Sequence, residues 1–69
     1  MDKESILINF GKTIQRLRKE KNLSQTQLAE RANVHRTYVG MIERAEKNIT
    51  LLNIERFAKA LDVNVKDLF

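Results

Sequence analysis

Three consecutive residues, Arg36, Thr37 and Tyr38, bring together a guanidinium group, a small hydroxyl and a phenol. All three side chains form hydrogen bonds, two of them are bulky, and the surrounding pattern needs none of them for a core. They follow the expected end of one short helix and lie at the start of another. Such a group is either a solvated helix face or a surface that binds a partner.

The groups that catalysis needs are missing from the sequence. Among 69 residues there is no cysteine and only one histidine, which excludes disulfides, thiolate or histidine-based metal sites and a Cys–His pair. No paired carboxylates or glycine-rich phosphate loop stand out, and Ser5 and Ser24 have no histidine at a suggestive spacing. A helical chain of this length also lacks the volume for a substrate cleft. We therefore expect no enzymatic activity, no cofactor and no small-molecule substrate.

The charge of the chain favours an acidic partner. Thirteen lysines and arginines against nine acidic residues give a net charge of +4, which suits nucleic acid first and an anionic membrane second. The longest apolar run, residues 6–8, is too short for a signal peptide or a membrane span. No helix joins an unburied apolar face to a basic face, so we expect no membrane partner. The expected compartment is the cytoplasm.

Apolar residues recur at helical spacing along the whole chain, which is read as one domain over residues 1–69. A first helix over about 5–21 has an apolar face formed by Ile6, Phe10, Ile14 and Leu17. Gly11 weakens this helix and suggests close packing there. Thr50 is predicted to cap a later helix with a face formed by Leu51, Ile54, Phe57, Ala58 and Leu61. Asn64 then caps a last turn that holds Val65, Leu68 and Phe69.

Two further helices are expected between these, separated by a short turn. Ser24 and Gln27 form a capping box at the start of the first of them. This helix ends just before Asn33, the non-glycine residue best suited to the left-handed conformation that terminates helices. His35 takes the N-cap position of the second helix, which runs to about Arg44. The chain is therefore predicted to be all-α, with five short helices.

These two helices and their turn are the parts of a helix-turn-helix. Ala29 is small because two steeply crossing helices must approach closely there. Val34, Val39 and Ile42 are expected to hold the second helix of the motif against the first helix of the motif and against the helix over about 5–21. The N-terminal end of the second helix, with the arginine, threonine and tyrosine, is then left projecting outward.

Residues 23–44, LSQTQLAERANVHRTYVGMIER, resemble the helix-turn-helix of the lambda repressor and Cro type of DNA-binding domain, the XRE-like family. The similarity continues through NITLLNIERFAKALDVNVKDLF and covers roughly residues 8–69. The segment HRTYVGMIER followed by KNIT is most similar to the controller proteins of restriction–modification systems, which are small dimeric regulators of their own operon. Asn33 stands where this family more often has glycine, and it meets the same conformational need.

The resemblance implies a role for each polar residue of the motif, with double-stranded operator DNA as the partner. The implied base readers in the major groove are Arg36, Thr37 and Tyr38. The implied contacts to the DNA backbone are Gln25, Lys47, Asn48, Thr50 and His35. Arg18 and Glu43 match a pair that forms an ion pair between the first and third helices in relatives.

Relatives bind as two-fold dimers to half-sites roughly 34 Å apart. A homodimer interface is therefore expected away from the base-reading helix, with Leu52, Val65 and Phe69 as candidates, whereas Leu68 is expected to close the core. An activator would in addition contact RNA polymerase, and Glu46 and Glu55 are candidates for that contact.

Several functions fit this resemblance. The chain is expected to be a controller protein, and a phage-type repressor or an antitoxin-like autoregulator are the alternatives within DNA-binding regulators. A helical module that binds another protein is an alternative of a different class. In such modules the base-reading helix loses its basic and polar residues, and Arg36, Thr37 and Tyr38 argue against that loss.

Overall fold

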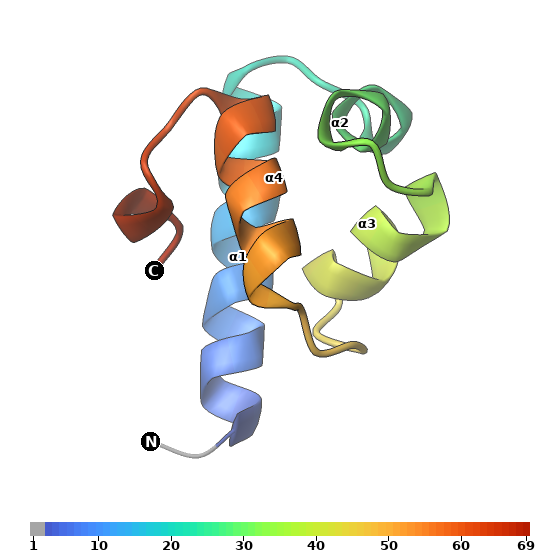
Figure 1. Cartoon of the computed structure of the whole chain (residues 1–69). Helices are drawn as coiled ribbons and strands as arrows, with labels where there is room; N and C mark the ends of the chain where they lie inside the picture. The colour runs from blue at the N-terminus through green and yellow to red at the C-terminus, as the bar shows by residue number, and fades with distance from the viewer. Residues whose placement is uncertain (1–2) are drawn as a thin grey trace.

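The computed structural model describes residues 3–69 and forms four α-helices and one short 3-10 helix in that range (Figure 1). The elements in chain order are α1 (Lys3–Glu20), α2 (Gln25–Ala32), α3 (Arg36–Glu43), α4 (Leu51–Leu61) and η1 (Val65–Leu68). No strand occurs within residues 3–69, so the predicted all-α class is confirmed. The fifth helix is corrected to a single 3-10 turn, because four residues are too few to close successive α-helical hydrogen bonds.

The first helix begins two residues earlier than expected and ends one residue earlier. The helices α1 and α4 lie next to each other at the centre, with α2 and α3 on one side and η1 on the other (Figure 1). None of the helices within residues 3–69 is long and apolar enough to cross a membrane. The core lies between these helices and is formed by Phe10, Ile14, Leu17, Leu23, Leu28, Ala29, Ala32, Val39, Ile42, Phe57, Ala58, Ala60, Leu61 and Leu68.

Local hydrogen bonds fix where the helices begin. The Ser24 hydroxyl accepts from the Gln27 backbone N–H at 3.0 Å, and the Ser24 N–H donates to the Gln27 side chain at 2.8 Å, which is the predicted capping box. The Thr50 hydroxyl accepts from the Asn53 N–H at 3.1 Å at the start of α4. Both caps satisfy backbone donors that the first turn of a helix leaves without a partner.

Each α-helix is followed by a residue in the left-handed conformation, and none of these residues is a glycine. They are Asn22, Asn33, Ala45 and Asp62, with φ between 57° and 59°. The prediction for Asn33 is confirmed, since its φ is 58° and its N–H bonds back to carbonyls of α2. Short polar side chains tolerate this conformation best, so alanine is the unusual choice in the set.

Two residues assigned to the core faces of helices are instead exposed, and those assignments were wrong. Leu51 is 80% exposed and Ile6 is 44% exposed. Leu51 is the first residue of α4, and the N-terminal turns of α1 extend beyond the other helices (Figure 1). Helical periodicity gives the face on which a residue lies but not how far the neighbouring helix reaches along it.

Gly11 lies where α1 meets the end of α3, and the close packing expected there is confirmed. A Cβ at this position would collide with the backbone carbonyl oxygen of Ile42 and lie 2.9 Å from that of Glu43. Backbone atoms cannot move aside as a flexible side chain can. The hydrogen side chain of glycine therefore sets the distance between α1 and α3.

We expect Gly11→Ala to lower the free energy of unfolding by roughly 1–2 kcal/mol, because overpacking outweighs the gain in helix propensity of about 1 kcal/mol. Urea unfolding followed by circular dichroism measures the change. The matched control is Gly40→Ala in α3, whose Cβ would meet only side-chain atoms, the end of Arg44 at 3.0 Å and that of Gln25 at 3.7 Å. A Gly11→Ala protein as stable as Gly40→Ala would contradict the close approach.

Candidate nucleic-acid interface

Arg36 and Thr37 are exposed in the first turn of α3, and they line a shallow polar pocket. The other residues around this pocket are Gln25, Gly40 and Arg44. Thr37, Gly40 and Arg44 are spaced by three and four residues and therefore share one helix face. Two guanidinium groups thus border one pocket at the surface of α2 and α3, a suitable arrangement for a polyanion.

Arg44 was not among the residues implied by the sequence, although its spacing from Thr37 was a signal that would have found it. Its Nε lies 3.0 Å from a carboxylate oxygen of Glu46, and more than half of each side chain is exposed. The hydrogen bond from Arg44 lowers the pKa of Glu46, and the same bond raises the pKa of Arg44. Exposed pairs contribute little to stability, so this guanidinium can exchange the carboxylate for another anion at small cost.

Tyr38 is half-buried against the core, so the interpretation that a core needs none of the three residues was wrong for this one. Its ring lies parallel to that of Phe57, with the ring centroids 6.2 Å apart and an interplanar angle of 9°. Its hydroxyl accepts a hydrogen bond from the Asn53 side chain in the first turn of α4, at 3.1 Å. Tyr38 therefore joins α3 to α4.

His35 acts as the N-cap of α3, as the sequence predicts. Its Nδ1 accepts a hydrogen bond from the Thr37 backbone N–H at 3.1 Å. A ring nitrogen that accepts carries no proton, so the neutral ring has its proton on Nε2. The exposed imidazole thus presents an N–H donor outward beside the first turn of α3.

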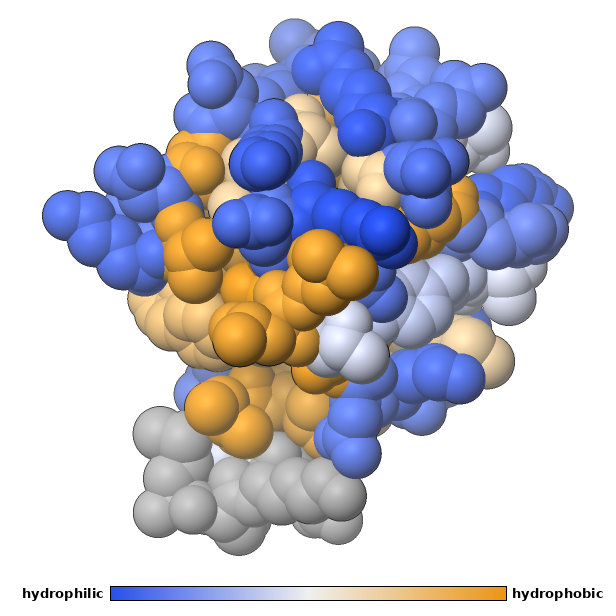
Figure 2. All heavy atoms as spheres, viewed as in Figure 1, coloured by the Kyte–Doolittle hydropathy of each residue, from blue (hydrophilic) through white to orange (hydrophobic). Residues whose placement is uncertain are grey.

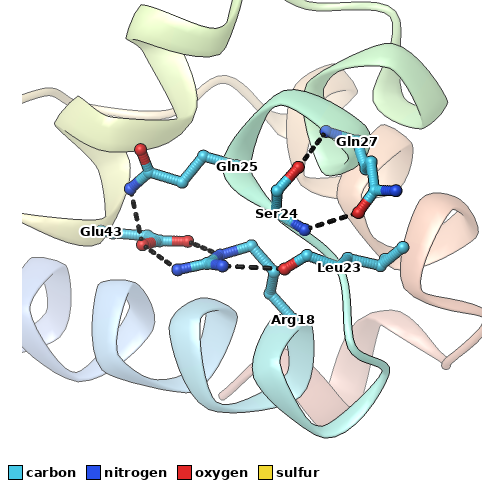
Figure 3. Close-up of polar contacts among 6 residues, drawn as sticks. All are labelled: Arg18, Leu23, Ser24, Gln25, Gln27 and Glu43. Carbon is cyan, nitrogen blue, oxygen red and sulfur yellow. Dashed lines mark hydrogen bonds and ion pairs between the residues drawn. The ribbon is translucent and has the colours of Figure 1, made fainter.

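A buried ion pair holds the helix-turn-helix to α1 (Figure 3). The Arg18 guanidinium donates to both oxygens of Glu43, at 2.6 and 3.1 Å, and to the Leu23 carbonyl at 2.8 Å. The two side chains are only 10% and 2% exposed. Gln25 donates from its amide to Glu43 at 3.0 Å, so the ion pair also fixes this side chain. This leaves the Gln25 amide oxygen and backbone N–H for other contacts.

The loop before α4 contains the remaining residues implied as backbone contacts. Lys47 and Asn48 are exposed there, and Thr50 is occupied as the cap of α4. The structure thus brings Gln25 and Arg36 to one pocket, whereas Lys47 and Asn48 lie in a separate loop beyond the other end of α3.

Apolar side chains gather on another face, over the start of α4 and beside η1 (Figure 2). Leu51, Leu52 and Val65 line one groove there together with Glu55, and they are 80%, 57% and 41% exposed. Phe69 borders a second groove formed with α1, where its ring packs on Phe10 at a centroid distance of 5.2 Å. The sequence pattern missed Leu51 in this exposed set. We call the set Leu51, Leu52 and Val65 the apolar face.

A family model described as helix-turn-helix matches residues 14–68. The chain belongs to this helix-turn-helix family. Control protein C.BamHI of Bacillus amyloliquefaciens is 45% identical over 65 residues, covering 93% of this chain and 80% of that protein. The crystal structure of the restriction-modification controller protein C.AhdI from Aeromonas hydrophila is 42% identical with a TM-score of 0.92, covering 94% of this chain and 98% of that one.

An immunity repressor protein of Bacillus phage phi105 is also similar, with 46% identity over 58 residues. That match covers 84% of this chain but 40% of the repressor. Relatives of both kinds therefore share this helix-turn-helix, and these two controller proteins also match over most of their own length. The family resemblance stated from the sequence is confirmed.

We expect Arg18→Ala to cost about 3–5 kcal/mol, because it leaves the Glu43 carboxylate buried without its counter-charge. A core of this size rarely supplies more than about 3–5 kcal/mol in total, so the variant should be largely unfolded by circular dichroism. Arg16→Ala is the matched control on the same helix. Its 59% exposed side chain pairs with Glu20, and its loss should change stability by less than about 0.5 kcal/mol.

The double variant Arg18→Met with Glu43→Leu removes both charges and keeps the volume, so it should regain much of the lost stability. An Arg18→Ala protein no less stable than Arg16→Ala would show that the buried pair is not what holds α1 to α3.

Proposed function

We propose that this chain is a sequence-specific DNA-binding regulator that places the N-terminal turn of α3 in the major groove. The observation that carries the proposal is the polar pocket that Arg36 and Thr37 of that turn share with Arg44 at the other end of α3. Helix-turn-helix proteins read base edges with this part of the second helix. The net charge of +4 and the names of the relatives support the same function.

The side chains of this turn have the chemistry that base reading needs. Arg36 carries two parallel donors that fit the O6 and N7 acceptors of guanine, and the methyl group of Thr37 can pack on the methyl group of thymine. Tyr38 presents a hydroxyl from a ring that is fixed against Phe57. We infer that these three residues read bases or the phosphates beside them.

Contacts to the DNA backbone would surround the base readers. Lys47 and Asn48 extend from the loop before α4, and Thr50 lies at the N-terminus of that helix, where backbone N–H groups attract phosphate. His35 offers its Nε2–H, and Gln25 offers its backbone N–H at the start of α2. We add Arg44, whose exposed guanidinium can leave Glu46 for a phosphate.

We further propose that two copies associate through the apolar face and bind a two-fold operator. One helix in one groove reads only a few base pairs, so a single copy would be poorly selective. Leu51, Leu52 and Val65 form an exposed apolar groove away from α3, and exposed patches of this kind mark interaction surfaces. Phe69, 64% exposed beside a neighbouring groove, would extend the contact.

Among regulators, the controller protein of a restriction–modification system fits best, because the controllers match this chain over most of both lengths. A phage-type repressor is the second candidate, supported by the similarity to the phi105 repressor. An activator would also contact RNA polymerase, and the exposed Glu55 at the edge of the apolar face is a candidate. Such a regulator would act in the cytoplasm and have no catalytic activity.

We expect Arg36→Ala to weaken operator binding by about 1–3 kcal/mol and to relax the preference at one base position. Lys47→Ala, the matched control, should weaken binding to all duplexes to a similar extent, because phosphate contacts carry no sequence information. Electrophoretic titration of duplexes selected from a random pool, and of unrelated duplexes, measures both effects. Unchanged preference in the Arg36→Ala protein would contradict base reading.

Salt separates DNA binding from the alternative of a protein-binding module. Association with DNA releases counterions and should weaken steeply between low and moderate salt, with Lys47→Ala reducing the slope by about one unit. A chain that selects no duplex from the pool, and whose partner binding ignores salt, would favour the protein-binding alternative.

We expect Leu52→Glu to convert the dimer into a monomer, because it places a charge in the centre of the apolar face. Analytical ultracentrifugation at tens of micromolar measures the mass. Ile8→Glu is the control, since Ile8 is 44% exposed on α1 and does not line the groove of the apolar face. A wild-type protein that sediments as a monomer under these conditions would contradict the proposed dimer.

A further inference from the structure

A chain of side-chain hydrogen bonds leads from α4 to the base-reading helix. The Asn53 amide nitrogen lies 3.1 Å from the Tyr38 hydroxyl oxygen, and the Asn53 amide oxygen lies 3.1 Å from an Arg56 guanidinium nitrogen. Asn53 and Arg56 are not among the residues assigned to DNA binding above. Both belong to α4, whose first turn carries Leu51 and Leu52 of the apolar face.

The donor and acceptor in each of these two hydrogen bonds can be assigned in one way only. A guanidinium group donates and never accepts, so the Asn53 atom facing Arg56 must be its oxygen. The Asn53 atom facing Tyr38 must then be the NH2 group, which donates and never accepts. The Tyr38 oxygen consequently accepts this bond, and its own proton cannot be directed at Asn53.

The proton of the Tyr38 hydroxyl is therefore left for another acceptor. Within residues 3–69 no hydrogen bond is present in which this hydroxyl donates. The ring cannot turn freely, because it lies parallel to Phe57 and packs against the core. A rigid ring with a fixed acceptor bond presents one O–H donor in a restricted set of directions.

We propose that Arg56 and Asn53 are positioning residues that make Tyr38 a hydrogen-bond donor to the bound DNA. This inference rests on the proposed DNA-binding function and adds the polarity of one contact. The partner atom is a hydrogen-bond acceptor of DNA, either a phosphate oxygen or an acceptor on a base edge. A donor group of the DNA, such as the amino group of cytosine or adenine, is disfavoured at this position because the hydroxyl oxygen already accepts from Asn53.

The test reverses the donor and acceptor roles in the hydrogen bond between residue 53 and Tyr38 without removing that bond. In Asn53→Asp the carboxylate can only accept hydrogen bonds. The Tyr38 hydroxyl would therefore donate to this carboxylate and no longer to DNA. An acidic residue in the first turn of α4 also suits the helix dipole, so the variant should fold normally, and its melting temperature checks this. Tyr38→Phe removes the hydroxyl and keeps the ring against Phe57.

Affinity is measured for wild type, both single variants and the double variant, on a duplex selected from a random pool and on an unrelated duplex of equal length. We expect Tyr38→Phe to weaken binding about tenfold, as for a hydrogen bond to a charged or strongly polar acceptor. Asn53→Asp should lower the DNA affinity of the wild-type protein by about tenfold or more, but that of the Tyr38→Phe protein by at most about threefold. The remaining threefold is the repulsion between the added charge and the phosphates.

The outcomes separate the possible partner atoms and the possible failures. If Tyr38→Phe lowers the affinity for both duplexes equally, the Tyr38 hydroxyl donates to a phosphate oxygen. If the affinity for the selected duplex falls more, the hydroxyl donates to a base edge. An Asn53→Asp effect of equal size with and without the hydroxyl overturns the positioning role, as does a Tyr38→Phe protein that binds like wild type. A wild-type chain that selects no duplex overturns the proposed function, and this inference with it.

Discussion

The arrangement of the helix-turn-helix depends on one buried ion pair, between Arg18 of α1 and Glu43 at the end of α3. The guanidinium also binds the carbonyl of Leu23, which comes just before the capping box of α2, and Glu43 also receives the amide of Gln25. A single cluster of charge thus ties together α1, the entry to α2 and the last turn of α3. Isolated charges are costly inside a protein, so these elements have one favourable arrangement, in which every partner is present.

With the end of α3 fixed in this way, the faces of that helix acquire separate tasks. Val39 and Ile42 are buried, while Thr37 and Arg44 border the exposed polar pocket. Tyr38 lies between the two faces, with its ring against the core and its hydroxyl bound to α4. The same few residues of α3 therefore contribute to stability and to the surface that we propose binds DNA. Tyr38 contributes to both, with its ring to stability and with its hydroxyl to the proposed surface.

Much of this structure was predictable because it is encoded by neighbouring residues. The capping box at Ser24, the left-handed Asn33 and the cap at His35 each depend on side chains within a few positions, and the structure contains all three. The site residues came mainly from the family resemblance. Tyr38 was misjudged, and Asn53 and Arg56 gave no signal, because their contacts exist only after α4 packs beside α3. Leu51 was misplaced for a related reason, because the periodicity of a helix does not show how far the neighbouring helices extend along it.

The left-handed residues that follow the helices bear on how freely the loop after α3 can move. Neither glycine of the sequence is used to end a helix, and the position after α3 is held by Ala45 at a φ of 59°. An alanine in this conformation costs about 1 kcal/mol relative to a relaxed residue, whereas glycine would adopt it freely. Glycine would also make the loop that carries Lys47 and Asn48 more flexible. A more flexible loop would lose more conformational entropy on binding. Alanine at this position therefore lowers stability slightly, and it also restricts the backbone of the loop that we propose contacts DNA, so less conformational entropy would be lost on binding.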